Sequence, residues 1–165
     1  MRSRSRVIWL LCALLPGPAL AAERIAVFDP ELYDTSGEGL REDQQHRLHL
    51  LGEALRRALA ESGRYEVVAI PEAVRARLAS GPSLRSCAPC APDAAAELGA
   101  GLAATMVVHK VSNLIISITV ALREAPSGAP RAVHSAEIRG NTDESWLRGL
   151  RWILRNRLLP EASPK

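Results

Sequence analysis

Residues 114–124 read Leu-Ile-Ile-Ser-Ile-Thr-Val-Ala-Leu-Arg-Glu, and large apolar side chains occupy every second position from Ile116 onward. Successive side chains of an extended strand point to opposite faces, so one face would be apolar and the other small or polar. The apolar face would carry Ile116, Ile118, Val120 and Leu122. This alternation predicts a half-buried antiparallel strand.

Similar apolar segments flank this strand, at Ala103–Val111 and Arg131–Arg139. The short intervals between them, Ser112-Asn113 and Ala125–Pro130, contain turn-forming residues. Two apolar segments separated by such a turn are typical of a β-hairpin. We therefore expect a meander of three antiparallel strands in the second half of the chain.

The first half of the chain alternates between strand and helix patterns. We expect a strand at Ile25–Asp29, a loop at Tyr33–Gly39, a helix at Arg41–Ser62, a strand at Tyr65–Ile70, a helix at Glu72–Ala79 and a helix that starts at Pro92. A helix between two neighbouring parallel strands makes a right-handed crossover. With strands numbered along the chain, we predict an α/β (α+β) fold with a mixed five-stranded sheet in the order 2-1-3-4-5 and helices packed on it.

The last helix is expected at Asp143–Leu158. Its apolar stripe toward the sheet would contain Leu147, Leu150, Ile153 or Leu154, and Leu158. Asn141 or Thr142 would cap the helix, and Asn141 with Glu144 would form a capping box, a structural role that also accounts for the acidic Asp143.

The same helix carries the candidate surface for a partner. Trp146 and Trp152 are separated by about 240° of rotation at 3.6 residues per turn, so only one of them can face the core. The candidate residues are Trp146, Arg148, Arg151, Trp152 and Arg155. The alternative interpretation is a solvated basic face without a partner.

The first 21 residues have the pattern of a secretory signal peptide. Arg2, Arg4 and Arg6 precede an apolar run at Val7–Leu15, and Ala19-Leu20-Ala21 supplies small residues for cleavage. The run is too short to span a bilayer core of about 30 Å, so we do not expect an integral membrane protein. We predict a periplasmic protein with a signal peptide at 1–21, a single α/β domain at 22–159 and a flexible tail at 160–165.

Cleavage of this leader would change the net charge. The sequence has 21 Lys and Arg against 18 Asp and Glu, and three of the basic residues lie in the leader. Basic and acidic residues would then balance at 18 each. Nucleic-acid binding needs a clustered positive excess, so the balance argues against a nucleic-acid partner.

Three segments carry a resemblance to known periplasmic folds. They are Ile-Ala-Val-Phe-Asp at 25–29, Ser-Gly-Arg-Tyr-Glu-Val-Val at 62–68 and Leu-Gly-Ala at 98–100. This series is similar to the amino-terminal α/β domain of TolB and to CsgG-type secretion lipoproteins.

Nearly all of Ile25–Leu159 also resembles a family of short exported proteobacterial proteins without an assigned function. The residues that carry this resemblance are Cys-Ala-Pro-Cys at 87–90, His-Lys-Val-Ser-Asn-Leu-Ile at 109–115 and Arg-Gly-Asn-Thr-Asp-Glu-Ser-Trp at 139–146. The family implies a binding or assembly accessory that acts through an envelope protein, and for some members an association with quinoprotein alcohol oxidation.

Cys87 and Cys90 are the only cysteines after the leader. An oxidising periplasm favours a disulfide between them. One interpretation is a structural staple, and the alternative is a redox-active dithiol. In Cys-x-x-Cys oxidoreductases the first cysteine starts a helix directly after a strand, a context that this sequence lacks. A zinc site would need four ligands, and only two thiolates are present.

Asp29, Glu31 and Asp34 follow a central strand, at the end of the sheet where open α/β folds bind ligands. Their oxygens are the ligand type of a hard cation. The spacing matches no calcium loop, so solvated loop charges are the simpler interpretation and we assign no metal.

No serine, cysteine or histidine lies in a recognisable nucleophile motif, and no phosphate-binding loop is present. We assign no catalytic residue and no cofactor. The sequence favours a periplasmic, non-catalytic accessory or binding module, and the family resemblance implies that it acts through a protein partner in envelope assembly or quinoprotein alcohol oxidation. The alternative is a thiol-disulfide protein that uses Cys87 and Cys90.

Overall fold

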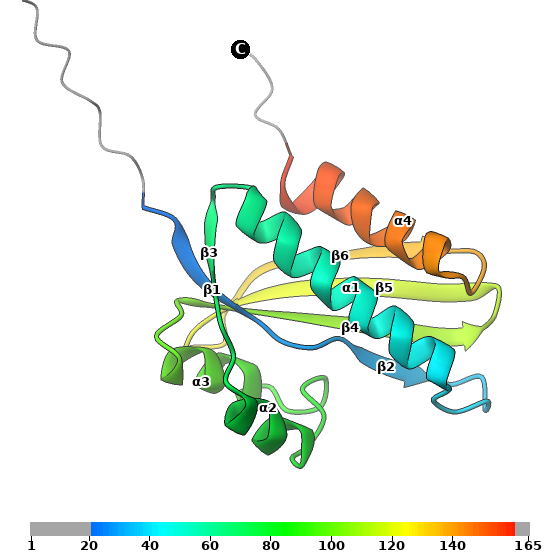
Figure 1. The fold of residues 1–165 in the computed structure, drawn as a ribbon, viewed down its shortest axis with the longest axis horizontal. Helices are drawn as coiled ribbons and strands as arrows, with labels where there is room; N and C mark the ends of the chain where they lie inside the picture. The colour runs from blue at the N-terminus through cyan, green and yellow to red at the C-terminus, as the bar shows by residue number, and fades with distance from the viewer. Residues whose placement is uncertain (1–20, 161–165) are drawn as a thin grey trace, which may run out of the picture.

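The computed structural model describes residues 21–160, whose arrangement is shown in Figure 1. The strands are β1 (Glu23–Val27), β2 (Glu31–Asp34), β3 (Tyr65–Val68), β4 (Leu102–Ser112), β5 (Ile115–Glu124) and β6 (Pro130–Ile138). The helices are α1 (Glu42–Glu61), α2 (Glu72–Ala79), α3 (Cys90–Glu97) and α4 (Asp143–Ile153), and a π-helical turn at Leu154–Leu158 continues α4. The expected signal peptide and flexible tail lie almost entirely outside the described residues.

Six strands form one mixed sheet in the order β3-β1-β4-β5-β6, with β2 paired to β4. The pairs among β3, β1 and β4 are parallel, and those among β4, β5 and β6 are antiparallel. The predicted fold class and the predicted order of five strands are therefore confirmed.

The sixth strand is the difference from the expected sheet. β1 pairs with residues 102–104 of β4, and β2 pairs with residues 107–110 of the same strand. The two short strands thus lie end to end along β4, interrupted at Asp29-Pro30. The predicted loop at Tyr33–Gly39 is wrong at its start, because Tyr33 and Asp34 belong to β2. The sequence did not predict β2, because turn-forming residues surround it and it has no apolar run. Backbone pairing with β4 holds it in place.

Helices cover the two faces of the sheet unequally (Figure 1). α1 and α4 cover one face and enclose the larger core together with the inward side chains of β1, β4, β5 and β6. α2 and α3 cover the other face only near β1, β3 and the start of β4, around Phe28, Val74 and Ala103. The predicted alternation in β5 is confirmed, because its burial changes at every residue from Ile116 to Leu122.

α4 packs on β6, on β5 and on α1. Its buried side chains include Trp146, Leu150 and Ile153, and Leu154 and Leu158 of the following turn are buried as well. Gly149 faces β6, and a Cβ added there would lie 2.6 Å from Cγ2 of Ile138. Glycine at this position therefore lets the helix approach the last strand closely. None of the described helices is long and apolar enough to cross a membrane.

The start of α4 differs by one residue from the expected capping box. Thr142, not Asn141, is the N-cap, and its hydroxyl accepts from the backbone N–H of Ser145 at 3.2 Å. The Ser145 hydroxyl lies 3.1 Å from the backbone nitrogen of Thr142 and closes the box, in place of the expected Glu144. Because Thr142 is the cap, the side chain of Asn141 does not bond to the first turn of backbone N–H groups.

Leu150→Ala is expected to lower the free energy of unfolding by about 2–5 kcal/mol, because it leaves a cavity between α4 and the sheet. Leu150 has no exposed surface. Arg151→Ala is the matched control on the same helix and should change stability by less than about 0.5 kcal/mol. Urea unfolding followed by circular dichroism measures both. Equal midpoints for wild type and Leu150→Ala would contradict this docking of α4.

Candidate functional site

A lysine is buried at the end of the helix-covered face of the sheet. Lys110 has no exposed surface, and it follows Met106 and Val108 at the inward positions of β4. Its ammonium lies 2.7 Å from Oε2 of Glu38 and 3.3 Å from Oδ2 of Asp34. The third donor direction is satisfied by Oγ of Ser36 at 3.0 Å. A buried charge is tolerated when it is paired and hydrogen-bonded in this way.

The charges of this cluster, Lys110, Asp34 and Glu38, stabilise one another. The Ser36 hydroxyl, which donates to Asp34, and Lys110 together hold the pKa of the Asp34 carboxyl below its usual value. The hydrogen bond from Lys110 lowers the pKa of Glu38. Burial acts to lower the pKa of Lys110, but the hydrogen bonds from its ammonium to Glu38 and Asp34 outweigh burial and raise it. All three groups are therefore held in their charged forms at neutral pH.

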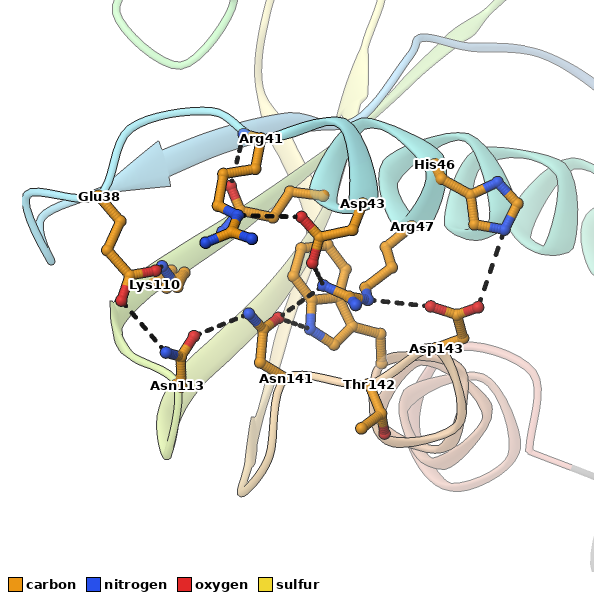
Figure 2. A network of polar contacts seen from close by, with 12 residues as sticks. Glu38, Arg41, Asp43, His46, Arg47, Lys110, Asn113, Asn141, Thr142 and Asp143 are labelled. Atoms are coloured by element: carbon orange, nitrogen blue, oxygen red, sulfur yellow. Dashed lines mark hydrogen bonds and ion pairs between the residues drawn. The ribbon is translucent and has the colours of Figure 1, made fainter.

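Hydrogen bonds continue from this cluster to α4, as Figure 2 shows. Asn113, in the turn between β4 and β5, donates to Oε1 of Glu38 at 3.2 Å. The side-chain oxygen Oδ1 of Asn113 accepts a hydrogen bond from the side-chain amide of Asn141 at 2.8 Å. Oδ1 of Asn141 accepts in turn from the indole N–H of the buried Trp146 at 3.1 Å. The two motifs at 109–115 and 139–146, which are 30 residues apart in the sequence, therefore meet through side chains.

Arg47 of α1 joins the same network from the other side. It donates to Asn141 at 3.2 Å and to Asp143 at 2.9 Å, and it pairs with Asp43 at 2.9 Å. His46 lies 3.8 Å from Asp143. Burial acts to raise the pKa of Asp43, and the hydrogen bond from Arg47 outweighs it and lowers that pKa. The network thus fixes the start of α4 against α1 and the β4–β5 turn (Figure 2).

This network is a polar joint that links α1, the start of α4 and the β4–β5 turn. The charged side chains of Lys110, Asp34, Arg47 and Asp143 are already bonded to one another or to neighbouring polar groups. Sequence reasoning missed Lys110 as a site residue. The sequence contained a sign of this role, because Lys110 is a charged residue at an inward-facing position of a strand that is otherwise apolar on that side.

The acidic residues after β1 do not meet around one point. Asp29 pairs with Arg56 and Arg75 of two different helices. Glu31 accepts from the Ser83 hydroxyl at 2.8 Å and from two backbone N–H groups of the segment after α2. Within residues 21–160, no three metal-ligating side chains of the His, Cys, Asp and Glu types cluster together.

Cys87 and Cys90 form the expected disulfide, with their Cα atoms 5.5 Å apart. The helix that was expected to start at Pro92 begins earlier, at Cys90. The segment before it follows α2 rather than a strand. The strand-to-helix context of redox dithiols is therefore absent around this disulfide.

One residue of the predicted partner surface on α4 is buried, and the others are exposed. Trp146 is fully buried, so including it in an exposed surface is wrong. Trp152 is 41% exposed, and the guanidinium of Arg157 lies 5.5 Å from its ring centre. Arg148, Arg151 and Arg155 are exposed on the same helical segment. Trp152 and Arg148 also line a groove of about 440 Å³ between α4 and β6.

The chain belongs to the family DUF3280, described as "Protein of unknown function (DUF2380)", whose model matches residues 23–158. This agrees with the expected membership of a family without an assigned function. Among curated proteins, no match to the sequence is found.

Solved structures show the same fold at low sequence identity. The C-terminal domain of LpoB from Salmonella enterica has a TM-score of 0.53 and 16% identity, over 74% of this chain and 87% of that domain. The NMR structure of E. coli LpoB gives 0.53 and 18%, over 73% of this chain and 58% of that one. The lipoprotein GNA1162 from Neisseria meningitidis gives 0.51 and 16%, over 85% and 99%. The resemblance to TolB and CsgG-type proteins stays a prediction.

Lys110→Met is expected to lower the free energy of unfolding at neutral pH by about 3–5 kcal/mol, because it leaves the nearly buried Asp34 carboxylate without its cation. Arg57→Met, an exposed change on α1, is the control and should have little effect. Chemical unfolding at pH 7 measures both variants. A Lys110→Met protein as stable as wild type would show that the joint does not depend on this ion pair.

The pairing of Lys110 with Asp34 and Glu38 also predicts how the free energy of unfolding changes at acid pH. Carboxyl groups whose folded-state pKa is lowered stabilise the protein above their unfolded pKa, and this contribution is lost as the pH falls through the folded value. Wild type should therefore lose stability steeply below about pH 4. The slope of unfolding free energy against pH should be smaller in Lys110→Met, and equal slopes would contradict the assignment.

Proposed function

We propose that this chain is a non-catalytic accessory module of the periplasm that holds a protein partner on the exposed side of α4. The proposal rests chiefly on Trp152, a large aromatic side chain that is exposed beside a groove and next to arginines. Tryptophan and arginine are the residue types most enriched among energetic hot spots of protein interfaces. The surface is also rigid, because the opposite side of α4 is docked on the sheet.

Two further observations support a binding role over catalysis. The charged groups around Lys110 and Arg47 bond to one another and hold the helices and the sheet together, whereas Trp152 and Arg148 of the α4 surface are exposed. The fold is similar to that of LpoB and of the lipoprotein GNA1162, which supports an envelope setting for this chain. The leader pattern at 1–21 supports export. Envelope assembly and quinoprotein alcohol oxidation are the two proposed settings.

The test is quantitative affinity capture from the native host, with the tagged full-length chain as bait. One envelope protein should co-purify with wild type and fall at least about tenfold with Trp152→Ser or Arg148→Glu. Arg57→Glu, exposed on α1 and away from the groove, should retain it. Equal recovery with all four baits would contradict the α4 surface as the binding site.

A thiol-disulfide function remains the second candidate because Cys90 lines a recess of about 280 Å³ together with Arg77 and Asp93. A thiol reagent would reach the disulfide through this recess. Measuring the reduction potential of the native protein separates the two candidates. A value below about −300 mV is expected for a structural staple, and a clearly higher value would favour redox chemistry.

A further inference from the structure

The groove beside α4 runs along the free edge of the sheet. β6 is the last strand in the sheet order, so one of its two sides pairs with no other strand of the described chain. The five consecutive residues 135–139 line the groove. Side chains of consecutive strand residues point to opposite faces. A run of consecutive residues can therefore line one groove only if the groove follows the edge, where the backbone itself is presented.

The central part of this edge lacks the usual protection against strand pairing. Natural edge strands carry charges, prolines or bulges that block a further strand. β6 begins with Pro130 and Arg131, next to a register shift in β5, and it carries Glu137 near its end. The residues between, 132–136 (Ala-Val-His-Ser-Ala), contain no proline and no Asp, Glu, Lys or Arg, and they pair with β5 in an unbroken register from Leu122 to Ile118. At the opposite edge of the sheet, β3 is only four residues long and includes Glu66. β2, which pairs only with β4, also has four residues, and two of them are acidic. Of these edges, β6 therefore offers the longest uncharged stretch to an added strand.

α4 supplies side chains at the spacing that an added strand would present. Figure 1 shows α4 lying along β6. Arg148 and Trp152 are four helical positions apart, which is about 6 Å along the axis at 1.5 Å per residue. Same-face residues of a strand repeat about every 6.7 Å. Two residues at positions i and i+2 of an added strand would therefore lie opposite Arg148 and Trp152.

The charges of the groove favour an acidic segment. Arg139 and Arg148 line it, and neither has an ion-pair partner among residues 21–160. Glu137 is the only acidic residue of the lining, and it is on the strand face that the burial pattern places away from α4. A carboxylate on the α4 side of an added strand would meet Arg148 without approaching Glu137.

We propose that the β6 edge accepts an extended segment of a partner protein as an additional strand, with a carboxylate opposite Arg148 and an apolar side chain opposite Trp152. Backbone pairing supplies affinity in this mode, and the alternate side chains supply specificity. This inference rests on the proposed function, because it names the kind of segment that the α4 surface holds.

The test uses a fluorescein-labelled, threonine-rich peptide of nine residues with one aspartate and one leucine two positions apart. The peptide is titrated with residues 22–165, the protein without its predicted leader. Binding should be followed by anisotropy, and amide exchange of residues 132–139 should slow in the complex. Arg148→Glu should weaken binding at least about tenfold, and a peptide with lysine in place of aspartate should restore it. Arg57→Glu, exposed on α1 and outside the groove, should bind as wild type.

Backbone methylation separates strand pairing from side-chain binding. Methyl groups on alternate peptide amides block one edge of the added strand, and shifting them by one residue blocks the other. One of the two methylated peptides should lose binding and the other should keep it. Equal behaviour of the two would overturn strand addition, as would failure of the unmethylated peptide to bind. If that failure came with a native partner that still depends on Trp152, the proposed function would stand without this inference.

Discussion

The buried ammonium of Lys110 is the constraint on which the rest of this structure depends. It occupies an inward position of β4 where an apolar side chain would be expected, and it is held there by Asp34 and Glu38. This requirement explains why β2 continues the line of β1 along β4, since Asp34 must sit beside Lys110 in the parallel register. The hydrogen bonds from Glu38 through Asn113 and Asn141 then carry this order to the start of α4.

The two sides of α4 follow from that anchoring. Trp146 fills the core and gives its N–H to Asn141, so the helix cannot rotate without losing that bond. Gly149 brings the helix close to β6, and Trp152 and Arg148 are left facing the groove at the sheet edge. One helix orientation thus places Trp146 in the buried polar joint and leaves Trp152 and Arg148 exposed at the surface for which we propose a binding role.

Much of this fold could be predicted from periodicity. The alternation in β5, the apolar stripe of α4 and the order of five strands follow from local patterns that tertiary packing preserves. β2 could not be predicted, because Glu31–Asp34 has no apolar run and is held by pairing with a strand more than 70 residues away. The site was predicted less well. Trp152 is exposed, but Trp146 is part of the core. Asn141 belongs to the hydrogen-bond network and Thr142 is the cap. Lys110 could be recognised only once Asp34 and Glu38 were seen beside it.

We propose that α4 and the β6 edge form one partner-binding surface. The most direct test is photo-crosslinking in cells of the native host, with a photoreactive amino acid placed at Ser135 of β6, at Trp152 of α4 or at Arg57 of α1. Ser135 and Trp152 line the groove and Arg57 does not. The same envelope protein should be crosslinked from Ser135 and Trp152, with no product from Arg57. Different proteins from the two groove positions, or crosslinks from Arg57 alone, would contradict the account.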